Sequence, residues 1–123
     1  MAKLLKNTFL VHAVLSGVLG LVMLTAPGRF LQLLGWAPID PILSRMLGAA
    51  LLALAWGDYH GWRGAEQATQ TLIVQMQLAF AALAGLSVLR HLLVARWPLM
   101  VWLLFIGCAA FAVLWGLALR RKA

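Results

Sequence analysis

The sequence predicts an all-α integral membrane protein, a bundle of four antiparallel membrane-spanning helices with a short interfacial helix between the first two. Its composition is the first reason: 64% of the 123 residues are hydrophobic and 11% are charged, whereas a soluble domain has about 45–50% apolar and about 25% charged residues. The second is that apolar residues form four runs long enough to cross about 30 Å of hydrocarbon. The third is that basic residues lie at the chain ends and near the boundaries of these runs.

Composition also excludes several classes of protein. A chain this short leaves much of its surface exposed, so a soluble globular fold, a disordered tail or a disulfide-stapled module does not fit. The single cysteine, Cys108, cannot form an internal disulfide. The formal net charge is +7. Nucleic-acid binders gather basic residues on one face, whereas here these residues lie at the chain ends and near the boundaries of the apolar runs. We therefore expect membrane lipids, and no nucleic acid, as partners.

The predicted spans are residues 8–26, 42–59, 72–94 and 98–119, within one domain of residues 1–123. Pro27 follows the first span where a signal peptidase would cleave, so we expect this span to be retained. Asp40 is expected to cap the second span, with Pro41 at its first helical position. Pro98 opens the fourth span by the same logic.

A short amphipathic segment separates the first two spans. Phe30, Leu33 and Leu34 fall at positions i, i+3 and i+4, and Gly35 and Pro38 then end the pattern. This spacing predicts one or two turns of helix lying in the membrane interface.

Basic residues set the expected orientation. Six lie on the side with both termini and the predicted loop of residues 57–68, and four lie on the other side: Arg29, Arg45, Arg90 and Arg96. The positive-inside rule then places both termini in the cytoplasm.

Small or polar residues recur at every fourth position in three spans. These stripes are His12, Ser16 and Gly20; Arg45, Ala49, Ala53 and Gly57; and Cys108, Ala112 and Gly116. Small residues let helices approach closely in lipid, so the stripes predict the packing surfaces of the bundle. A substrate pathway along the same stripes is the alternative.

The third span has the longest polar face. A helix over residues 65–95 would be about 46 Å long, longer than the hydrocarbon is thick. Buried amides need partners, so we expect this face to pack against protein, either within the bundle or in another subunit. Its packing or partner residues are Gln70, Gln77, Ala81, Ala84 and Ser87.

Histidines raise the question of haem or chlorophyll. The predicted topology places His12 and His91 near opposite membrane surfaces, so both cannot ligate one haem iron. Either alone remains a candidate ligand for a chlorophyll magnesium, and a pair of His12 with His60 is a further alternative. We favour the interpretation in which His12 and His91 lie at the membrane interface and their ring nitrogens are satisfied by local contacts.

Arginines near the span ends suggest contact with anions. Arg45 and Arg90 lie about one turn inside their spans and are expected to snorkel to the head groups. Together with Arg29 and Arg96 they suit an anionic lipid or a quinone head group. Asp40 is their candidate acidic partner.

The predicted loop of residues 57–68 gathers most other titratable groups. Asp58, His60 and Glu66 suggest a metal or acid–base site, but their spacing matches no known ligand motif. We therefore predict an interfacial turn, no catalytic residue and no metal site. With no acidic residue expected in the membrane core, a proton-coupled transporter is disfavoured.

The stretch Leu34-Gly35-Trp36, the pair Asp40-Pro41 and the run from Arg45 to Ala50 resemble small bacterial four-span membrane proteins that are broadly DoxX-like. This resemblance implies a four-helix bundle in the bacterial inner membrane. It carries over no catalytic residue.

Three functions follow as hypotheses. The first is a non-catalytic accessory subunit of a larger membrane complex, respiratory or photosynthetic, with other integral membrane subunits as partners. The second is an autonomous DoxX-like protein in redox or quinone-linked chemistry. The third is a pigment- or haem-binding subunit.

Overall fold

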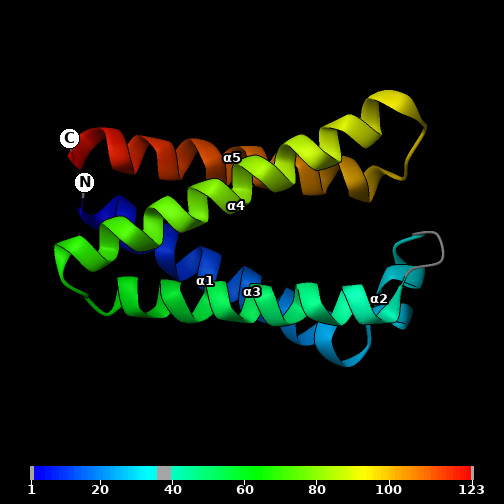
Figure 1. The fold of residues 1–123 in the computed structure, drawn as a ribbon, viewed down its shortest axis with the longest axis horizontal. Coiled ribbons are helices and arrows are strands. Elements are labelled where there is room, and N and C mark those ends of the chain that lie inside the picture. Colours follow the sequence, from blue (N-terminus) through cyan, green and yellow to red (C-terminus); the bar gives the residue numbers. More distant parts are fainter. Residues whose placement is uncertain (1, 36–39, 123) are drawn as a thin grey trace. The chain divides into compact units, whose positions relative to one another are not determined.

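The computed structural model describes residues 2–35 and 40–122, in which every regular element is a helix (Figure 1). The helices are α1 (Ala2–Thr25), α2 (Pro27–Leu33), α3 (Pro41–Trp62), α4 (Gln67–Val94) and α5 (Leu99–Lys122). They divide into an N-terminal unit, Met1–Glu66, and a C-terminal unit, Gln67–Ala123. The all-α prediction is confirmed.

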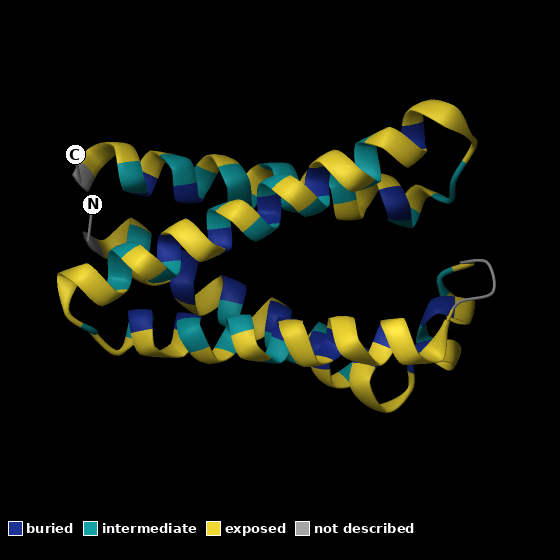
Figure 2. Ribbon diagram, viewed as in Figure 1, coloured by how far each residue is buried: buried dark blue, intermediate teal, exposed yellow. Residues whose placement is uncertain are grey.

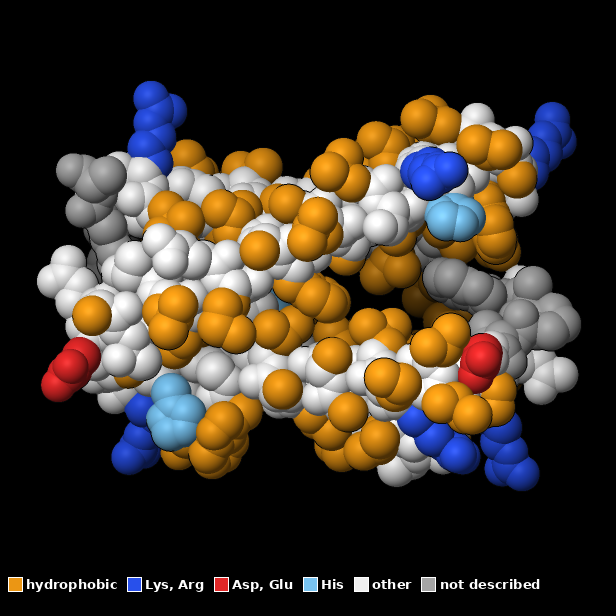
Figure 3. Space-filling model, viewed as in Figure 1, with side chains coloured by type: hydrophobic (Ala, Val, Ile, Leu, Met, Phe, Trp, Pro, Cys, Tyr) orange, Lys and Arg blue, Asp and Glu red, His pale blue; other side chains and the backbone are white. Residues whose placement is uncertain are grey.

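Among the described residues, three helices are long and apolar enough to cross a membrane, namely Lys3–Thr25, Gln67–Val94 and Leu99–Arg121. This is consistent with the predicted membrane protein. Figure 3 shows hydrophobic side chains along the helices, with Lys and Arg side chains toward the helix ends. Helix α3 is not among these three, although it has 22 residues, because polar residues such as Arg45 and Asp58 lower its hydropathy.

In the N-terminal unit, α1 and α3 run antiparallel and pack closely. A Cβ atom on Gly48 would lie 2.8 Å from the carbonyl oxygen of Gly20 and 2.7 Å from the backbone nitrogen of Leu24. Such contact is available only to residues without side chains, which explains why glycines stand at this crossing. The predicted stripe of His12, Ser16 and Gly20 is buried, as expected.

The stripe predicted for the second span is not the face of α3 that packs on α1. Arg45, Ala49 and Ala53 are exposed within the N-terminal unit. The buried residues of α3 are instead Ser44, Gly48, Leu51, Asp58 and Gly61. The prediction relied on small residues alone and therefore identified a neighbouring line on the helix surface. The face that packs on α1 also contains a leucine and an aspartate.

The predicted loop of residues 57–68 is wrong, because α3 continues to Trp62 and α4 begins at Gln67. Gly61 does not break α3, because the helix packs on the ring of Phe9 at this position. A Cβ on Gly61 would lie 2.7 Å from that ring, so only glycine fits here. The long third helix is confirmed: α4 has 28 residues, or about 42 Å at 1.5 Å per residue.

The start of α3 is as predicted. Asp40 Oδ1 accepts hydrogen bonds from the backbone N–H groups of Ile42 at 2.8 Å and Leu43 at 3.2 Å, and Pro41 occupies the first turn. These bonds satisfy two of the donors that a helix N-terminus leaves open.

Helix α2 confirms the short helix predicted between the first two spans. It begins at Pro27, and Gly35 follows its end with a φ of +73°. Its buried residues are Pro27 and Leu31, whereas Leu33 is 86% exposed, as an apolar side chain that faces lipid would be. The position of α2 in the membrane interface stays a prediction. The predicted stop at Pro38 lies outside the described residues.

The C-terminal unit is an antiparallel hairpin of α4 and α5. A Cβ on Gly85 would lie 3.4 Å from the Cβ of Cys108, so this pair marks a close approach of the two helices. Trp115 is fully buried and stacks on Phe111, with ring centroids 6.4 Å apart. Figure 2 shows exposed positions along much of both helices, as expected for surfaces that face lipid.

Candidate functional site

The most unusual feature of the described residues is an ionisable pair buried between α1 and α3. His12 Nδ1 lies 2.6 Å from Asp58 Oδ2, and the two side chains are 9% and 0% exposed. His12 comes from the third turn of α1, and Asp58 from the second-last turn of α3. The pair joins two helices of the N-terminal unit.

Ser16 completes the polar cluster from one turn further along α1. Its Oγ lies 3.3 Å from His12 Nδ1 and 3.4 Å from His12 Nε2. The tautomer of the imidazole decides which group donates, and the hydroxyl can either donate or accept. Ser16 therefore offers the ring a second polar neighbour beside Asp58.

The sequence folds this way because glycines and an aromatic residue close the helices around the pair. Phe9, one turn before His12, is fully buried and packs on Gly61, one turn after Asp58. On the other side of the pair, Gly20 and Gly48 bring the backbones together. The pair is thus held between two close contacts.

Pairing is what makes this burial tolerable. An isolated carboxylate in an apolar interior costs several kcal/mol or more. The ring nitrogen of His12 gives the buried carboxyl group of Asp58 a hydrogen-bonding partner. The geometry suits an interhelical clasp, since both side chains are enclosed.

The proposed pairing of His12 with His60 is wrong. His60 is exposed and meets the ring of Trp56 edge-on, with centroids 4.8 Å apart. The grouping of Asp58, His60 and Glu66 is wrong for the same reason, because Asp58 is buried while the other two are exposed. Among the described residues, no group of three His, Cys, Asp or Glu side chains is placed to hold a metal ion.

His91, the other candidate ligand, is exposed near the end of α4. Its Nδ1–H donates to the carbonyl oxygen of Ser87 at 2.8 Å, and its own carbonyl accepts from Trp97 Nε1 at 3.0 Å. These are the local contacts expected of an interfacial histidine. Arg90 and His91 also line an open pocket of about 440 Å³ at this end of the hairpin.

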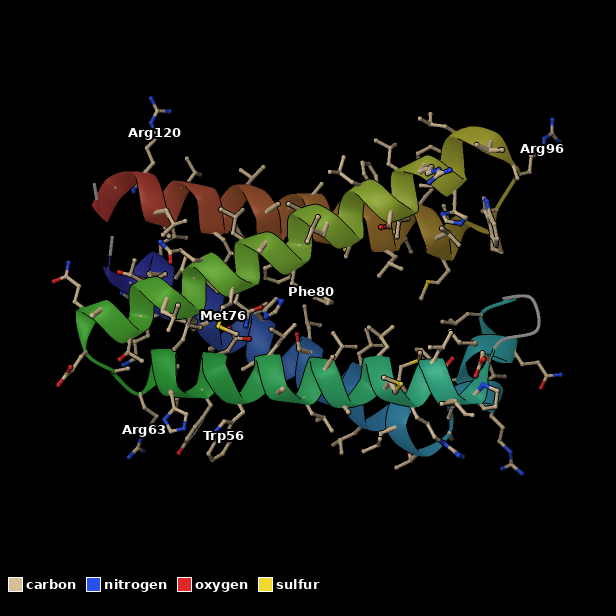
Figure 4. The ribbon with its side chains drawn as sticks, in the orientation of Figure 1. Trp56, Arg63, Met76, Phe80, Arg96 and Arg120 are labelled. Carbon is tan, nitrogen blue, oxygen red and sulfur yellow. The ribbon has the colours of Figure 1, made fainter. Side chains whose placement is uncertain are left out.

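The four arginines predicted to contact lipid or anions, Arg29, Arg45, Arg90 and Arg96, are all exposed. Arg96 projects outward from the turn between α4 and α5 (Figure 4). Asp40 caps α3 through Oδ1. Contact of these arginines with lipid stays a prediction.

The predicted partner face of α4 divides in two. Gln77 and Ala81 are buried, Gln70 and Ala84 are half-buried, and Ser87 is exposed. The buried line of the helix continues through Gly85. The middle of the predicted face, Gln77 and Ala81, is therefore closed to another subunit, and its open part includes Ala84 and Ser87.

Sequence reasoning considered Asp58 only with His60 and Glu66 and missed its burial and its pairing with His12, although a signal was present. Ser44, Gly48, Leu51, Ala55 and Asp58 follow one another at spacings of four, three, four and three, which is a helical stripe. Treating Gly57 and its neighbours as a turn ended this stripe too early.

Comparison with models of protein families, with curated proteins and with solved structures found no match to the chain. The DoxX-like resemblance accordingly stays a prediction.

Proposed function

We propose that the chain is a four-span protein of the bacterial inner membrane and a non-catalytic subunit of a larger membrane assembly. The burial of His12 and Asp58 carries this proposal. Their side chains are 9% and 0% exposed and lie 2.6 Å apart, so their polar atoms join two helices instead of facing a substrate. Chemistry on a bound molecule would need at least one of these groups within its reach.

The pair also supports α3 as the fourth span. Its 22 residues correspond to about 33 Å of helix, close to the thickness of the hydrocarbon. His12 gives the buried carboxyl group of Asp58 a polar partner at 2.6 Å, and Arg45, about one turn from the start of α3, can snorkel. These contacts remove much of the cost that the polar residues of α3 would otherwise impose.

Reporter fusions test this topology. A phosphatase joined after Gly35 should be active, which places that end of α1 outside the cytoplasm. The same reporter joined after Gly64 should be inactive because α3 has returned the chain to the cytoplasm. Equal activity at both positions would overturn the fourth span.

The open part of the predicted partner face supports association with another membrane subunit. Ser87 is exposed and Ala84 is half-buried, and small residues let a second helix approach in lipid. In gentle detergent the wild-type chain should therefore migrate with a high-mass complex on a native gel.

Ser87→Phe should release the chain from that complex, because the ring would hold a second helix away. Leu86→Phe is the matched control, since Leu86 is already large and is 64% exposed. Migration of the wild-type chain as a monomer or a small homo-oligomer would overturn the subunit proposal.

The same pair favours one alternative, an autonomous membrane protein in redox or quinone-linked chemistry. Ionisable residues inside a membrane are costly and often functional, and a histidine–carboxylate pair can exchange protons. If this alternative holds, Asp58→Asn should abolish the quinone-linked redox activity while leaving the fold intact. An absorption spectrum of the purified protein separates both functions from pigment or haem binding.

A further inference from the structure

An apolar groove lies on the surface of the N-terminal unit, between α1 and α3. It has a volume of about 440 Å³. Its lining residues are uncharged and are supplied by both helices: Leu10, Ala13, Val14, Leu52, Ala55, Trp56, Tyr59 and Trp62. Ala13 and Ala55 are small residues among larger neighbours, so they leave room for a chain-like apolar group.

Aromatic rings line the part of the groove formed by the C-terminal turns of α3. Trp56 and Tyr59 stack with ring centroids 5.7 Å apart and planes 23° apart, and Tyr59 lies 6.2 Å from Trp62. Tryptophan and tyrosine favour the head-group level of a bilayer. This part of the groove is therefore suited to the boundary between acyl chains and head groups.

Two basic side chains lie over the faces of these rings. Lys6 Nζ lies 5.8 Å from the centre of the Trp62 ring, and Arg63 Cζ lies 6.0 Å from the centre of the Tyr59 ring. Both basic side chains are exposed. Figure 4 shows Trp56 and Arg63 projecting from the same side of α3. An apolar groove thus leads to a positively charged, aromatic end.

We propose that this groove binds an anionic phospholipid, with one acyl chain along Ala13 and Ala55 and the phosphate group beside Lys6 and Arg63. The charge complementarity decides the class of occupant, because cations at the end of an apolar channel match an acidic head group on an acyl chain. The inference rests on the four-span arrangement proposed above. The site differs from the contacts predicted for Arg29, Arg45, Arg90 and Arg96.

Native mass spectrometry of the full chain in detergent tests the head-group part. The probes are phosphatidylglycerol and phosphatidylcholine with identical acyl chains. We expect the first to bind about tenfold more tightly. The double variant Lys6→Gln/Arg63→Gln should lose this preference. The matched variant Arg120→Gln/Arg121→Gln removes the same charge from two exposed positions and should keep it.

Equal loss of preference in both double variants would mean that only the total positive charge attracts the lipid, and would overturn the proposal. So would equal affinity of the wild-type chain for the two lipids. Neither result depends on a partner subunit, so the native-gel test of the proposed function stands apart from this one.

A second pair of variants tests the groove itself without changing charge. Ala13→Phe fills the groove and should weaken binding of phosphatidylglycerol about tenfold, whereas Ala110→Phe on the exposed surface of α5 should not. If Ala13→Phe lowers the helical signal in circular dichroism, Val14→Trp replaces it, because Val14 lines the groove and is 56% exposed. Unchanged binding in the folded groove variant would overturn the proposal.

Discussion

His12 Nδ1 lies 2.6 Å from Asp58 Oδ2 across 46 residues of sequence. The contact fixes the register of two antiparallel helices, because sliding α1 by one residue along α3 would separate the pair by about 1.5 Å. It also explains how α3 holds a buried carboxylate. Each of the two buried side chains has the other as a polar partner. Replacing either residue is therefore expected to destabilise the packing of α1 on α3.

Removing one member of this pair should therefore be costly. We expect Asp58→Ala to lower the free energy of unfolding by about 3–5 kcal/mol, since it leaves His12 buried without its carboxylate. Asp58→Asn should cost less, because the amide oxygen can still accept a hydrogen bond. Thermal unfolding followed by circular dichroism in detergent measures both effects. His60→Ala is the control, and an equal loss in that exposed position would contradict the clasp.

How far the sequence predicts this site depends on each helix. The stripe of His12, Ser16 and Gly20 identifies the packing face of α1 because it combines small residues with polar side chains, whereas the neighbouring small pair, Ala13 and Gly17, has no polar side chain. On α3 the small residues Ala49 and Ala53 form an equally regular line that is exposed. Periodicity alone does not distinguish two parallel lines on one helix; the partner that selects between them, His12, lies far away in the sequence.

Helix boundaries show the same limit. The N-terminus of α3 is predictable because Asp40 and Pro41 act locally, through backbone hydrogen bonds and a fixed φ. Its C-terminus is not, because Gly61 is helical owing to packing against Phe9, a tertiary contact. Residues 57–62 therefore look like a turn in sequence and fold as helix.

The crossing of Gly20 and Gly48 leads to a second prediction. Gly48→Leu should destabilise the N-terminal unit by about 3 kcal/mol or more, since the new side chain would meet the backbone of α1. Ala49→Leu, one residue away and exposed, should change stability by about 0.5 kcal/mol or less. Unfolding midpoints of the two variants in the same detergent provide the comparison. Similar midpoints would refute close packing at Gly48.

Membrane orientation is a third prediction. A phosphatase reporter fused after Ala123 should be inactive, because the basic residues favour cytoplasmic termini. Arg96 and Arg120 lie at opposite ends of the α4–α5 hairpin (Figure 4), so a reporter inserted after Arg96 should instead be active. A green fluorescent reporter at the same two positions is the control and should give the opposite pattern. Activity of the phosphatase after Ala123 would reverse the predicted orientation.

The contact between Gly85 and Cys108 provides the last prediction. A Cβ on Gly85 would lie 3.4 Å from the Cβ of Cys108, just below the range of about 3.5–4.5 Å found in disulfides. Gly85→Cys should therefore form a disulfide with Cys108 when the protein is oxidised in detergent.

Trypsin reveals this bond, because cleavage after Arg96 separates α4 from α5 unless the two helices are linked. The linked fragments should run as one band on a gel without reductant and as two bands with it. Leu86→Cys is the matched control, since Leu86 is the next residue and is 64% exposed; its fragments should separate in both conditions. Linkage through Leu86→Cys but not through Gly85→Cys would mean that α4 packs on α5 through a different face.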